Sequence, residues 1–347
     1  MKKDCIQSAL LVGAGSIGKR HLEIISERFH SIVVIDPDIE IYKYLSKMPY
    51  FDRVEYLSKL PQLKNLSRID LAVISNWGPD HYEVFTKLAE SGIKNFIIEK
   101  PLADSFYELN QMKQLMESMK LNVRTNLGIL YSEIPKKLFE FEKTYKIGTP
   151  RSIIVYGGAK CIATIGIHYV ALANYLFKNR PSAVSAVLRS HEINPRNKSL
   201  VYLEGSAQWI YPNDQYLSLN FSNTSQIDPK CIILYSNAEI SIYNQTLVLK
   251  KISNKDLQTL NKPTKTASAS ETILEISINT HEDIMSSINN VFDSLARTEV
   301  SIESQWGFAA TYDLLSALVS SELQRVIKLP IENDSLEFLY QKKWRIS

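Results

Sequence analysis

The sequence predicts an α/β protein with a doubly wound parallel sheet, followed by an α+β domain with an open, mostly antiparallel sheet. The chain has 347 residues, more than the roughly 250 to 300 at which single cores stop growing, so we expect two domains. Up to residue 126, apolar runs alternate with amphipathic segments, which is typical of a parallel sheet covered on both faces. Strand-like runs then follow one another, so we place the domains at 1–126 and 127–347.

In the N-terminal domain we expect five strands, because each run is apolar and is bounded by turn residues or by a helix-like segment. The runs are ALLVGA (9–14), SIVVID (31–36), LAVISN (71–76), NFIIEK (95–100) and NVRTNL (122–127). Amphipathic periodicity predicts the helices between them. These cover residues 17–29, 39–47, 80–91 and 105–119.

In the C-terminal domain we expect one helix over residues 164–177, lying on one face of the sheet. The predicted strands cover 183–190, 201–211, 215–222, 230–235, 238–243 and 246–250. Residues 254–270 are polar and rich in Thr and Ser, which predicts a mobile loop. Helices over 280–296 and 303–324 and a strand or extended tail at KLPIEN complete the domain, and we expect these helices to pack back on the first domain.

Composition excludes several classes of function. The net charge is +3 and the 40 basic residues are scattered, so nothing indicates a nucleic-acid or membrane surface. The first apolar segment is too short for a signal peptide, and no run reaches the about 18 apolar residues of a membrane span. The three cysteines, Cys5, Cys161 and Cys231, are far apart, and the histidines lack metal-ligand spacing. We therefore expect a cytoplasmic protein without a metal.

The segment VGAGSIG has G-x-G-x-x-G spacing between a predicted strand and a predicted helix. Such glycines allow a tight turn, close approach of a pyrophosphate and close packing of helix on strand. Asp36 ends the second strand, where a carboxylate accepts the ribose hydroxyls and repels a 2′-phosphate, so we expect NAD rather than NADP. The glycines could instead only shape a turn. The cofactor contacts expected in this loop are Gly13, Gly15, Ser16, Ile17 and Gly18.

A second motif, SNWGPDH, follows the strand LAVI. Ligands of open parallel sheets bind beyond the carboxyl ends of the strands, so Ser75, Asn76 and Trp77 are expected to line the cofactor. Asp80 suits the N-cap of the next helix. For His81, a cofactor contact and a packing or capping role are both open.

The third motif, EKP, ends the strand NFII. Here Lys100 would stand at the same edge as the glycine loop, where an amine could bind a substrate oxygen and stabilise an alkoxide. Glu99 is expected to contact the cofactor, and Asp104 or Ser105 to cap the next helix. Taken alone, a lysine at a strand end is more often a solvated side chain.

The order and spacing of these motifs resemble the glucose-fructose oxidoreductase / inositol dehydrogenase / MocA (Gfo/Idh/MocA) family over nearly the whole chain. The resemblance implies a Rossmann domain, a C-terminal domain with an open sheet, and hydride transfer on a sugar, polyol or related substrate. It also implies that Lys100 is catalytic.

The family's second signature, D-x-G-x-H, corresponds to TIGIH, which implies that His168 is catalytic. Thr164 stands where the family has aspartate, and Ala171 where many members have another acid. A threonine can form hydrogen bonds but cannot carry a proton away. Either His168 and Lys100 suffice for catalysis, or Lys160 takes over part of the role of the aspartate, or the chemistry is altered. Lys160 and Thr164 are expected to contact the substrate. His168 could also be an ordinary core histidine.

The function expected from the resemblance is NAD-dependent hydride transfer on a sugar or nucleotide-sugar of surface polysaccharide biosynthesis. Two alternatives stay open: an NAD-binding sensor or partner protein without turnover, and a reductase of the same fold with a non-sugar substrate. YGGAK (156–160) has the Y-x-x-x-K spacing of short-chain dehydrogenases, but its glycines make a helix improbable. Because a broad sheet face must be covered, we expect a homodimer or homotetramer.

Overall fold

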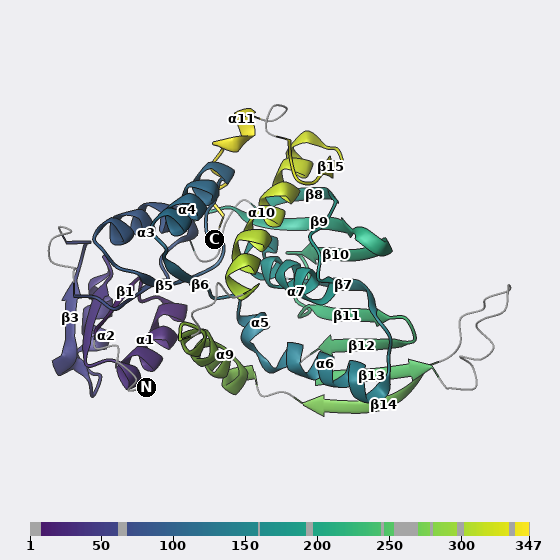
Figure 1. Ribbon diagram of the computed structural model, residues 1–347, viewed down its shortest axis with the longest axis horizontal. Helices are drawn as coiled ribbons and strands as arrows, with labels where there is room; N and C mark the ends of the chain where they lie inside the picture. The colour runs from purple at the N-terminus through teal and green to yellow at the C-terminus, as the bar shows by residue number, and fades with distance from the viewer. Residues whose placement is uncertain are drawn as a thin grey trace. The chain divides into compact units, whose positions relative to one another are not determined.

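The structure, a computed structural model, consists of two compact units. The first comprises Met1–Tyr131, Met285–Tyr312 and Phe338–Ser347, and the second comprises Ser132–Ile284 and Asp313–Glu337. One sheet of six strands and one of nine confirm the predicted fold class (Figure 1). The structure describes residues 8–61, 68–158, 160–191, 197–243, 246–252, 270–277, 280–296, 302–332 and 337–346.

The six-stranded sheet of the first unit is parallel throughout, with the order β3-β2-β1-β4-β5-β6 of a doubly wound fold. Its strands are β1 (Ser8–Val12), β2 (Ser31–Ile35), β3 (Val54–Leu57), β4 (Leu71–Ile74), β5 (Asn95–Ile98) and β6 (Asn122–Thr125). All five predicted strands are confirmed. The sequence interpretation missed β3, because this edge strand is only half-buried and lacks a continuous apolar run.

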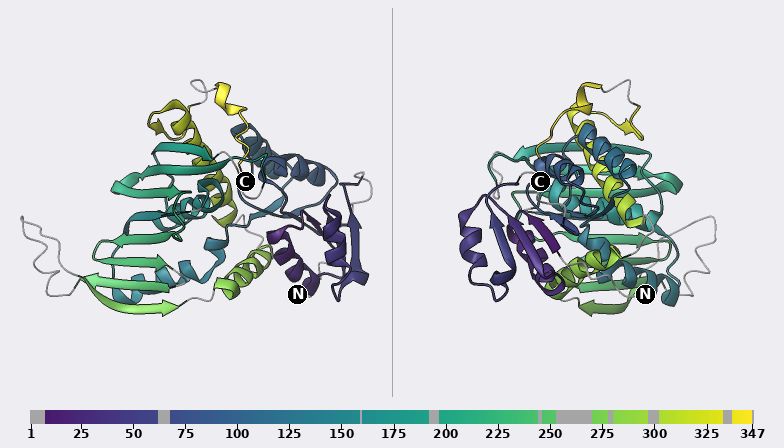
Figure 2. Two further views of the ribbon diagram at one scale, coloured as in Figure 1. Left: turned by 180° about the vertical axis from the view of Figure 1, so that it is seen from behind. Right: turned by 60° about the vertical axis from the view of Figure 1, so that its left-hand side comes forward.

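The four helices predicted before residue 126 are confirmed as α1 (Ser16–Arg28), α2 (Ile39–Leu45), α3 (His81–Glu90) and α4 (Phe106–Ser118). The single turn α5 (Gly128–Tyr131) and the 3-10 turns η1 (Phe51–Arg53) and η3 (Gly78–Asp80) were not predicted. Figure 2 shows α3 and α4 on one face of the sheet and α1 on the other. Ser105 caps α4 by accepting the Glu108 N–H at 3.2 Å, so Asp104 is not the cap. Asp80 occupies the N-cap of α3, but its side chain makes no capping bond.

The nine-stranded sheet of the second unit has the order β14-β13-β12-β11-β7-β10-β9-β8-β15, and it is antiparallel except for the β7/β10 pair. Its strands are β7 (Pro150–Gly158), β8 (Ala183–His191), β9 (Tyr202–Tyr211), β10 (Gln215–Ser222), β11 (Lys230–Tyr235), β12 (Ala238–Tyr243), β13 (Thr246–Ile252), β14 (Ser270–Ser277) and β15 (Ile327–Lys328). The strands β7 and β14 were not predicted. Both carry exposed polar residues that interrupt the apolar pattern.

Two helices of the second unit lie on one face of this sheet. They are α6 (Glu133–Tyr145) and α7 (Ile167–Phe177), and α7 continues from the π-helical turn η4 (Ile162–Gly166). The predicted helix at 164–177 is therefore confirmed, but α6 was missed. Pro135 obscured it, although proline is tolerated in a first helical turn.

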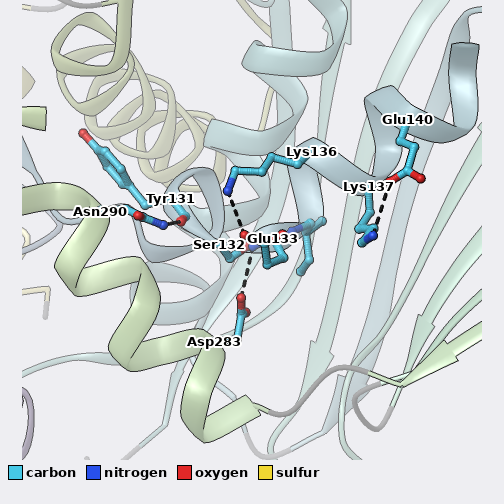
Figure 3. Close-up of polar contacts among 9 residues, drawn as sticks. Tyr131, Ser132, Glu133, Lys136, Lys137, Glu140, Asp283 and Asn290 are labelled. Atoms are coloured by element: carbon cyan, nitrogen blue, oxygen red, sulfur yellow. Dashed lines mark hydrogen bonds and ion pairs between the residues drawn. The ribbon is translucent and has the colours of Figure 1, made fainter. Parts of the chain in front are cut away.

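The helices α9 (Thr280–Ser294) and α10 (Ile302–Leu323) confirm the last two helix predictions. The described residues also form the short turns η5 (Pro212–Asp214) and α11 (Glu337–Tyr340). In the second unit, the Glu133 N–H at the start of α6 donates to Asp283 Oδ1 at 3.0 Å (Figure 3). In the first unit, Asn290 Nδ2 donates to Tyr131 O at 2.8 Å.

The KLPIEN segment contributes only the second residue of β15, which pairs with β8. Almost all of the loop predicted at 254–270 lies outside the described residues. Among the described helices, none has the length and apolar character needed to span a membrane.

Candidate active site

The turn after β1 requires glycine at two positions. Gly13 has a φ of +84°, and a Cβ there would lie 2.6 Å from Asn76 N. At Gly18, a Cβ would lie 2.1 Å from Gly13 O. Because both contacts are with backbone atoms, a side chain at either position would force the backbone to move. The first and third glycines of the motif thus hold the turn against β4 and against its own helix.

The second glycine has open space beside it. A Cβ at Gly15 would meet no atom within 4 Å, and Gly15 is the N-cap residue of the 13-residue helix α1. Ser16 is exposed and Ile17 is partly exposed at the start of this helix. The free N–H groups and the dipole of a helix N-terminus favour a phosphate group. The loop therefore offers the space and the donors that a dinucleotide pyrophosphate needs.

Asp36 faces the glycine turn from the end of β2. Its Oδ2 accepts the Ala14 N–H at 2.7 Å, and its Oδ1 accepts the Asp38 N–H at 2.9 Å. Tyr56 supports this bend by donating its hydroxyl to Asp36 O at 2.7 Å. Each carboxylate oxygen has a second lone pair, so Asp36 can also accept a ribose hydroxyl. The role of Tyr56 was not predicted, because β3 was missed.

The segment after β4 contains one side chain that binds the glycine turn directly. Ser75 is buried, and its hydroxyl donates to Gly13 O at 2.7 Å. Next to it, Asn76 Oδ1 is buried without a hydrogen-bond partner among the described residues. Trp77 is 40% exposed. An unpartnered buried amide oxygen and an exposed indole beside the glycine turn are consistent with a bound nucleotide.

His81 joins two loops at the carboxyl edge of the sheet. Its ring is buried, with Nδ1 2.9 Å from Pro101 O and Nε2 3.1 Å from Asn76 O. Burial lowers the pKa of His81, although the two carbonyls favour the protonated ring. Both ring nitrogens thus face backbone carbonyls of the protein itself, which supports the packing role left open by the sequence.

Glu99 lies in a buried polar cluster. Its Oε1 is 2.9 Å from His21 Nε2 of α1 and accepts from Asn126 Nδ2 at 2.6 Å. Burial by itself would raise the pKa of Glu99, but the hydrogen bond and charge of His21, the charge of Lys100 and the Asn126 bond lower it to about 2. Neither His21 nor Asn126 was assigned a role from the sequence. His21 lies three residues after Gly18, on the buried face of α1, and this spacing was the available signal.

Lys100 follows β5 and is partly exposed. The peptide bond between Lys100 and Pro101 is cis. The loop after it is fixed at Leu102, whose N–H donates to Thr311 Oγ1 of α10 at 3.2 Å. Together with the His81 contact to Pro101 O, this bond fixes the Pro101–Leu102 peptide group, which lies one residue after Lys100.

The sites predicted in the C-terminal domain lie around the start of α7. His168 is in the first turn of α7 and is partly exposed, and Thr164 is buried in the preceding π-helical turn. The Thr164 hydroxyl donates to Cys161 O at 3.4 Å. Lys160 lies just before this turn, with its Nζ 3.4 Å from Asp228 Oδ1. Such π-helical turns occur often at functional sites.

A buried polar cluster that was not predicted from the sequence anchors α7. Asn174 Nδ2 donates to Asp313 Oδ2 at 2.8 Å, and Tyr211 donates its hydroxyl to Asn174 Oδ1 at 2.7 Å. Arg180 binds both oxygens of Asp313, and Trp209 Nε1 donates to Asp313 O at 3.0 Å. Because buried polar groups are costly when unpaired, this cluster fixes the helix that carries His168 in one orientation.

The structure bears on two further sequence features, the YGGAK segment and the cysteines. The residues YGG of YGGAK belong to strand β7, so Tyr156 and Lys160 do not share a helix. Cys161 and Cys231 are buried free thiols, and burial raises the pKa of Cys231 to about 12. Among the described residues, no cluster of His, Cys, Asp and Glu could hold a metal ion.

One family model matches the N-terminal part of the chain. Residues 8–127 match the family described as "oxidoreductase family, NAD-binding Rossmann fold", with the model name GFO_IDH_MocA. A search of curated proteins finds no match.

Many solved structures share the fold. A levoglucosan dehydrogenase in complex with NADH and levoglucosan has a TM-score of 0.74 at 15% identity, covering 93% of this chain and 99% of its own. A UDP-N-acetylglucosamine 3-dehydrogenase from Acidithiobacillus ferrooxidans has a TM-score of 0.66 at 14% identity, with 91% and 98% covered. A super-repressor mutant of Gal80p from Saccharomyces cerevisiae has a TM-score of 0.73 at 15% identity, with 93% and 97% covered. At these identities the likeness is one of fold.

Proposed function

Because residues 8–127 belong to the Gfo/Idh/MocA oxidoreductases with an NAD-binding Rossmann fold, we propose that the protein is an NAD-dependent dehydrogenase or reductase acting on a carbohydrate. Lys100 binds the reacting oxygen, and His168 exchanges the proton of the hydroxyl group. The cofactor lies along the glycine turn, with Asp36 at the adenosine ribose.

The register of three neighbouring strands carries the proposal. Val12 pairs with Ile74, and Ile74 pairs with Ile98. The residues that follow these strands, Gly13, Ser75 and Glu99, therefore lie at one edge of the sheet, and Lys100 comes next. This is the edge at which ligands of doubly wound sheets bind. The arrangement supports a catalytic rather than a solvated Lys100.

The chemistry follows from the charge of each group. Bound NAD supplies or accepts the hydride. The Lys100 ammonium donates a hydrogen bond to the substrate oxygen and stabilises the negative charge that forms there. The His168 imidazole can take up or return a proton near neutral pH.

Thr164 does not replace the family's aspartate as a proton carrier, because a hydroxyl does not ionise near neutral pH. Its bond to Cys161 O instead supports a role in shaping the turn before α7. Lys160 is close to the Asp228 carboxylate, which supports a binding role for it rather than proton transfer. We assign Lys160 to substrate binding, Thr164 to shaping the substrate-binding turn before α7, and proton transfer to His168 alone.

Asp36 favours NAD over NADP. Its carboxylate is fixed against Ala14 N and Asp38 N, so it cannot turn away from a 2′-phosphate, and Asp38 adds a second negative charge. Repulsion between these like charges would weaken NADP binding.

The substrate class rests on the structural relatives. The levoglucosan and UDP-N-acetylglucosamine dehydrogenases both act on sugars, as their names state, which supports a sugar or nucleotide-sugar substrate, in keeping with surface polysaccharide biosynthesis. We also propose a cytoplasmic protein, since Cys161 and Cys231 are free thiols. The outer face of the nine-stranded sheet carries half-buried apolar side chains such as Ile154 and Ile232, which supports a homodimer or homotetramer.

The test is to incubate the protein with NAD and a panel of sugars and nucleotide-sugars while following the absorbance of the reduced nicotinamide. Lys94 and Lys100 lie at opposite ends of β5, so Lys94→Ala is the matched control. We expect Lys100→Ala to lower kcat about 100-fold or more and Lys94→Ala to leave it unchanged. Equal turnover by Lys100→Ala and wild type would overturn the proposed mechanism.

The second candidate is an NAD-binding sensor without turnover. Two observations favour it: threonine at position 164, and the likeness in fold to Gal80p, of which a super-repressor form is known. This candidate predicts tight NADH binding, measured by nicotinamide fluorescence, with no turnover of any substrate in the panel. It also predicts that Lys100→Ala binds NADH as wild type does.

A further inference from the structure

Residues 343–346, here called the strap, bind the loop after Lys100. The strap and the loop both belong to the first unit. The Trp344 N–H donates to Asp104 O at 3.0 Å, and the Arg345 N–H donates to Asp104 Oδ2 at 3.0 Å. Lys343 Nζ lies 2.6 Å from Glu108 Oε1 on α4. Asp104 thus accepts consecutive N–H groups of a segment about 240 residues away along the chain.

The strap also lies against the segment after β4. A Cβ at Gly78 would lie 2.8 Å from Ile346 O and 3.6 Å from Pro101 Cγ. Ile346 is fully buried. Ile346 O of the strap therefore leaves no room for a side chain at Gly78, while Pro101 lies at ordinary van der Waals distance. The strap fixes two loops at once, one following Trp77 and the other following Lys100.

Asp104 does not cap the helix that follows it. Ser105 performs the capping of α4, and the Asp104 side chain is fully buried beside Glu108, which is 4% exposed. Burial and the charge of Glu108 raise the pKa of Asp104 to about 6. Burying two adjacent carboxyl groups costs free energy. The hydrogen bonds from the strap to Asp104 offset part of this cost.

We propose that Asp104 is a positioning residue: by binding the strap across Gly78 and Pro101, it fixes the loop that presents Lys100. The catalytic consequence rests on the proposed function of Lys100, whereas the positioning itself does not. Without the strap bonds, Lys100 stays near the end of β5, but its amine samples a wider range of positions.

The test measures the reactivity of the Lys100 amine, which requires no substrate. The full-length protein is treated with a neutral amine-labelling reagent, and the labelling rate of each lysine is followed by mass spectrometry. We expect Asp104→Ala to raise the labelling rate of Lys100 about threefold or more, with the exposed Lys113 as internal reference. Asp52→Ala, an exposed aspartate of η1, is the matched control and should leave the rate unchanged.

Two further variants keep the test decisive. Asp104→Asn keeps an oxygen that can accept the Arg345 N–H, so it should restore the wild-type rate. Arg345→Pro removes the N–H that donates to Asp104. Because Arg345 has a φ of +51°, which proline cannot adopt, this substitution also changes the backbone of the strap. It should raise Lys100 labelling as Asp104→Ala does. If Asp104→Ala unfolds the protein, the Arg345→Pro result decides.

Turnover separates this proposal from the proposed function. With a working substrate, we expect Asp104→Ala to lower kcat about tenfold with little change in the NADH dissociation constant. An unchanged Lys100 labelling rate in Asp104→Ala and Arg345→Pro would overturn the positioning role. Full activity of Lys100→Ala would overturn the catalytic role of Lys100 and leave the positioning result standing.

Discussion

Glu99 and His21 are 2.9 Å apart, between Oε1 and Nε2, in the interior of the Rossmann unit. The bond joins the residue before Lys100 to the helix that begins at the glycine turn. Glu99 therefore connects the predicted cofactor loop with the predicted catalytic loop, and its carboxylate is buried in the interior of the unit.

Glu99→Gln should destabilise the protein. A neutral amide cannot replace a buried charged acceptor, so we expect the free energy of unfolding to fall by about 2 kcal/mol. Glu55→Gln, on the exposed side of β3, is the matched control and should change it by less than about 0.5 kcal/mol. Urea unfolding at pH 7 measures both. A Glu99→Gln protein as stable as wild type would contradict the assigned contact.

Asp104 predicts a pH dependence of stability. Its pKa is raised from 3.8 to about 6 in the folded state, by burial and then by Glu108, with Lys343 opposing. A raised pKa means that the stabilising contribution is complete below 3.8 and is lost as the pH rises through 6. Between pH 4 and 7 this should remove about 2 kcal/mol from the free energy of unfolding.

Asp104→Asn should flatten this part of the curve, because the amide does not titrate. Asp52→Asn should keep the wild-type slope. The measurement is urea unfolding at half-unit steps from pH 4 to pH 7.5. The prediction is wrong if wild type and Asp104→Asn lose stability in parallel.

Local patterns explain what could be predicted from the sequence. Strands β1, β4 and β5 are buried on both faces and have continuous apolar runs, whereas β3 and β7 are half-exposed and do not. The glycine turn and Lys100 follow strand ends, so their position at the sheet edge follows from topology. The contact of Asp104 with Arg345 could not be predicted, because residues so distant in sequence leave no local signal.

Asp36 allows a test of cofactor choice. Asp36→Asn leaves one oxygen to serve the N–H groups of Ala14 and Asp38, and it removes the charge that opposes a 2′-phosphate. We expect the NADH dissociation constant to rise about tenfold and the preference for NADH over NADPH to shrink. Asp52→Asn, at an exposed aspartate of η1, is the matched control and should change neither dissociation constant. Nicotinamide fluorescence titration measures both constants, and an unchanged preference would contradict the prediction.

His168 and Thr164 should differ sharply on substitution. His168→Asn removes the proton-transfer group, so kcat should fall about 100-fold or more while NADH binding is kept. Thr164→Val removes a hydroxyl that cannot carry a proton, so kcat should fall less than about fivefold. Steady-state kinetics with the substrate found in the panel decides. A loss for Thr164→Val as large as for His168→Asn would assign the hydroxyl a direct part in catalysis.

In the glycine turn, Gly18→Ala should mainly lower stability, whereas Gly15→Ala should mainly weaken NADH binding. A Cβ at Gly15 meets no atom within 4 Å, whereas a Cβ at Gly18 lies 2.1 Å from Gly13 O. Gly18→Ala should therefore lower the free energy of unfolding by about 3 kcal/mol. Gly15→Ala should leave stability within about 0.5 kcal/mol of wild type, because its methyl group fills only open space.

That open space is where the pyrophosphate is expected, so Gly15→Ala should weaken NADH binding about tenfold or more despite its normal stability. Urea unfolding and nicotinamide fluorescence titration, made on the same preparations, separate the two effects. If Gly15→Ala binds NADH as tightly as wild type, the dinucleotide does not approach the backbone there. The glycine turn would then be explained by packing at Gly13 and Gly18 alone.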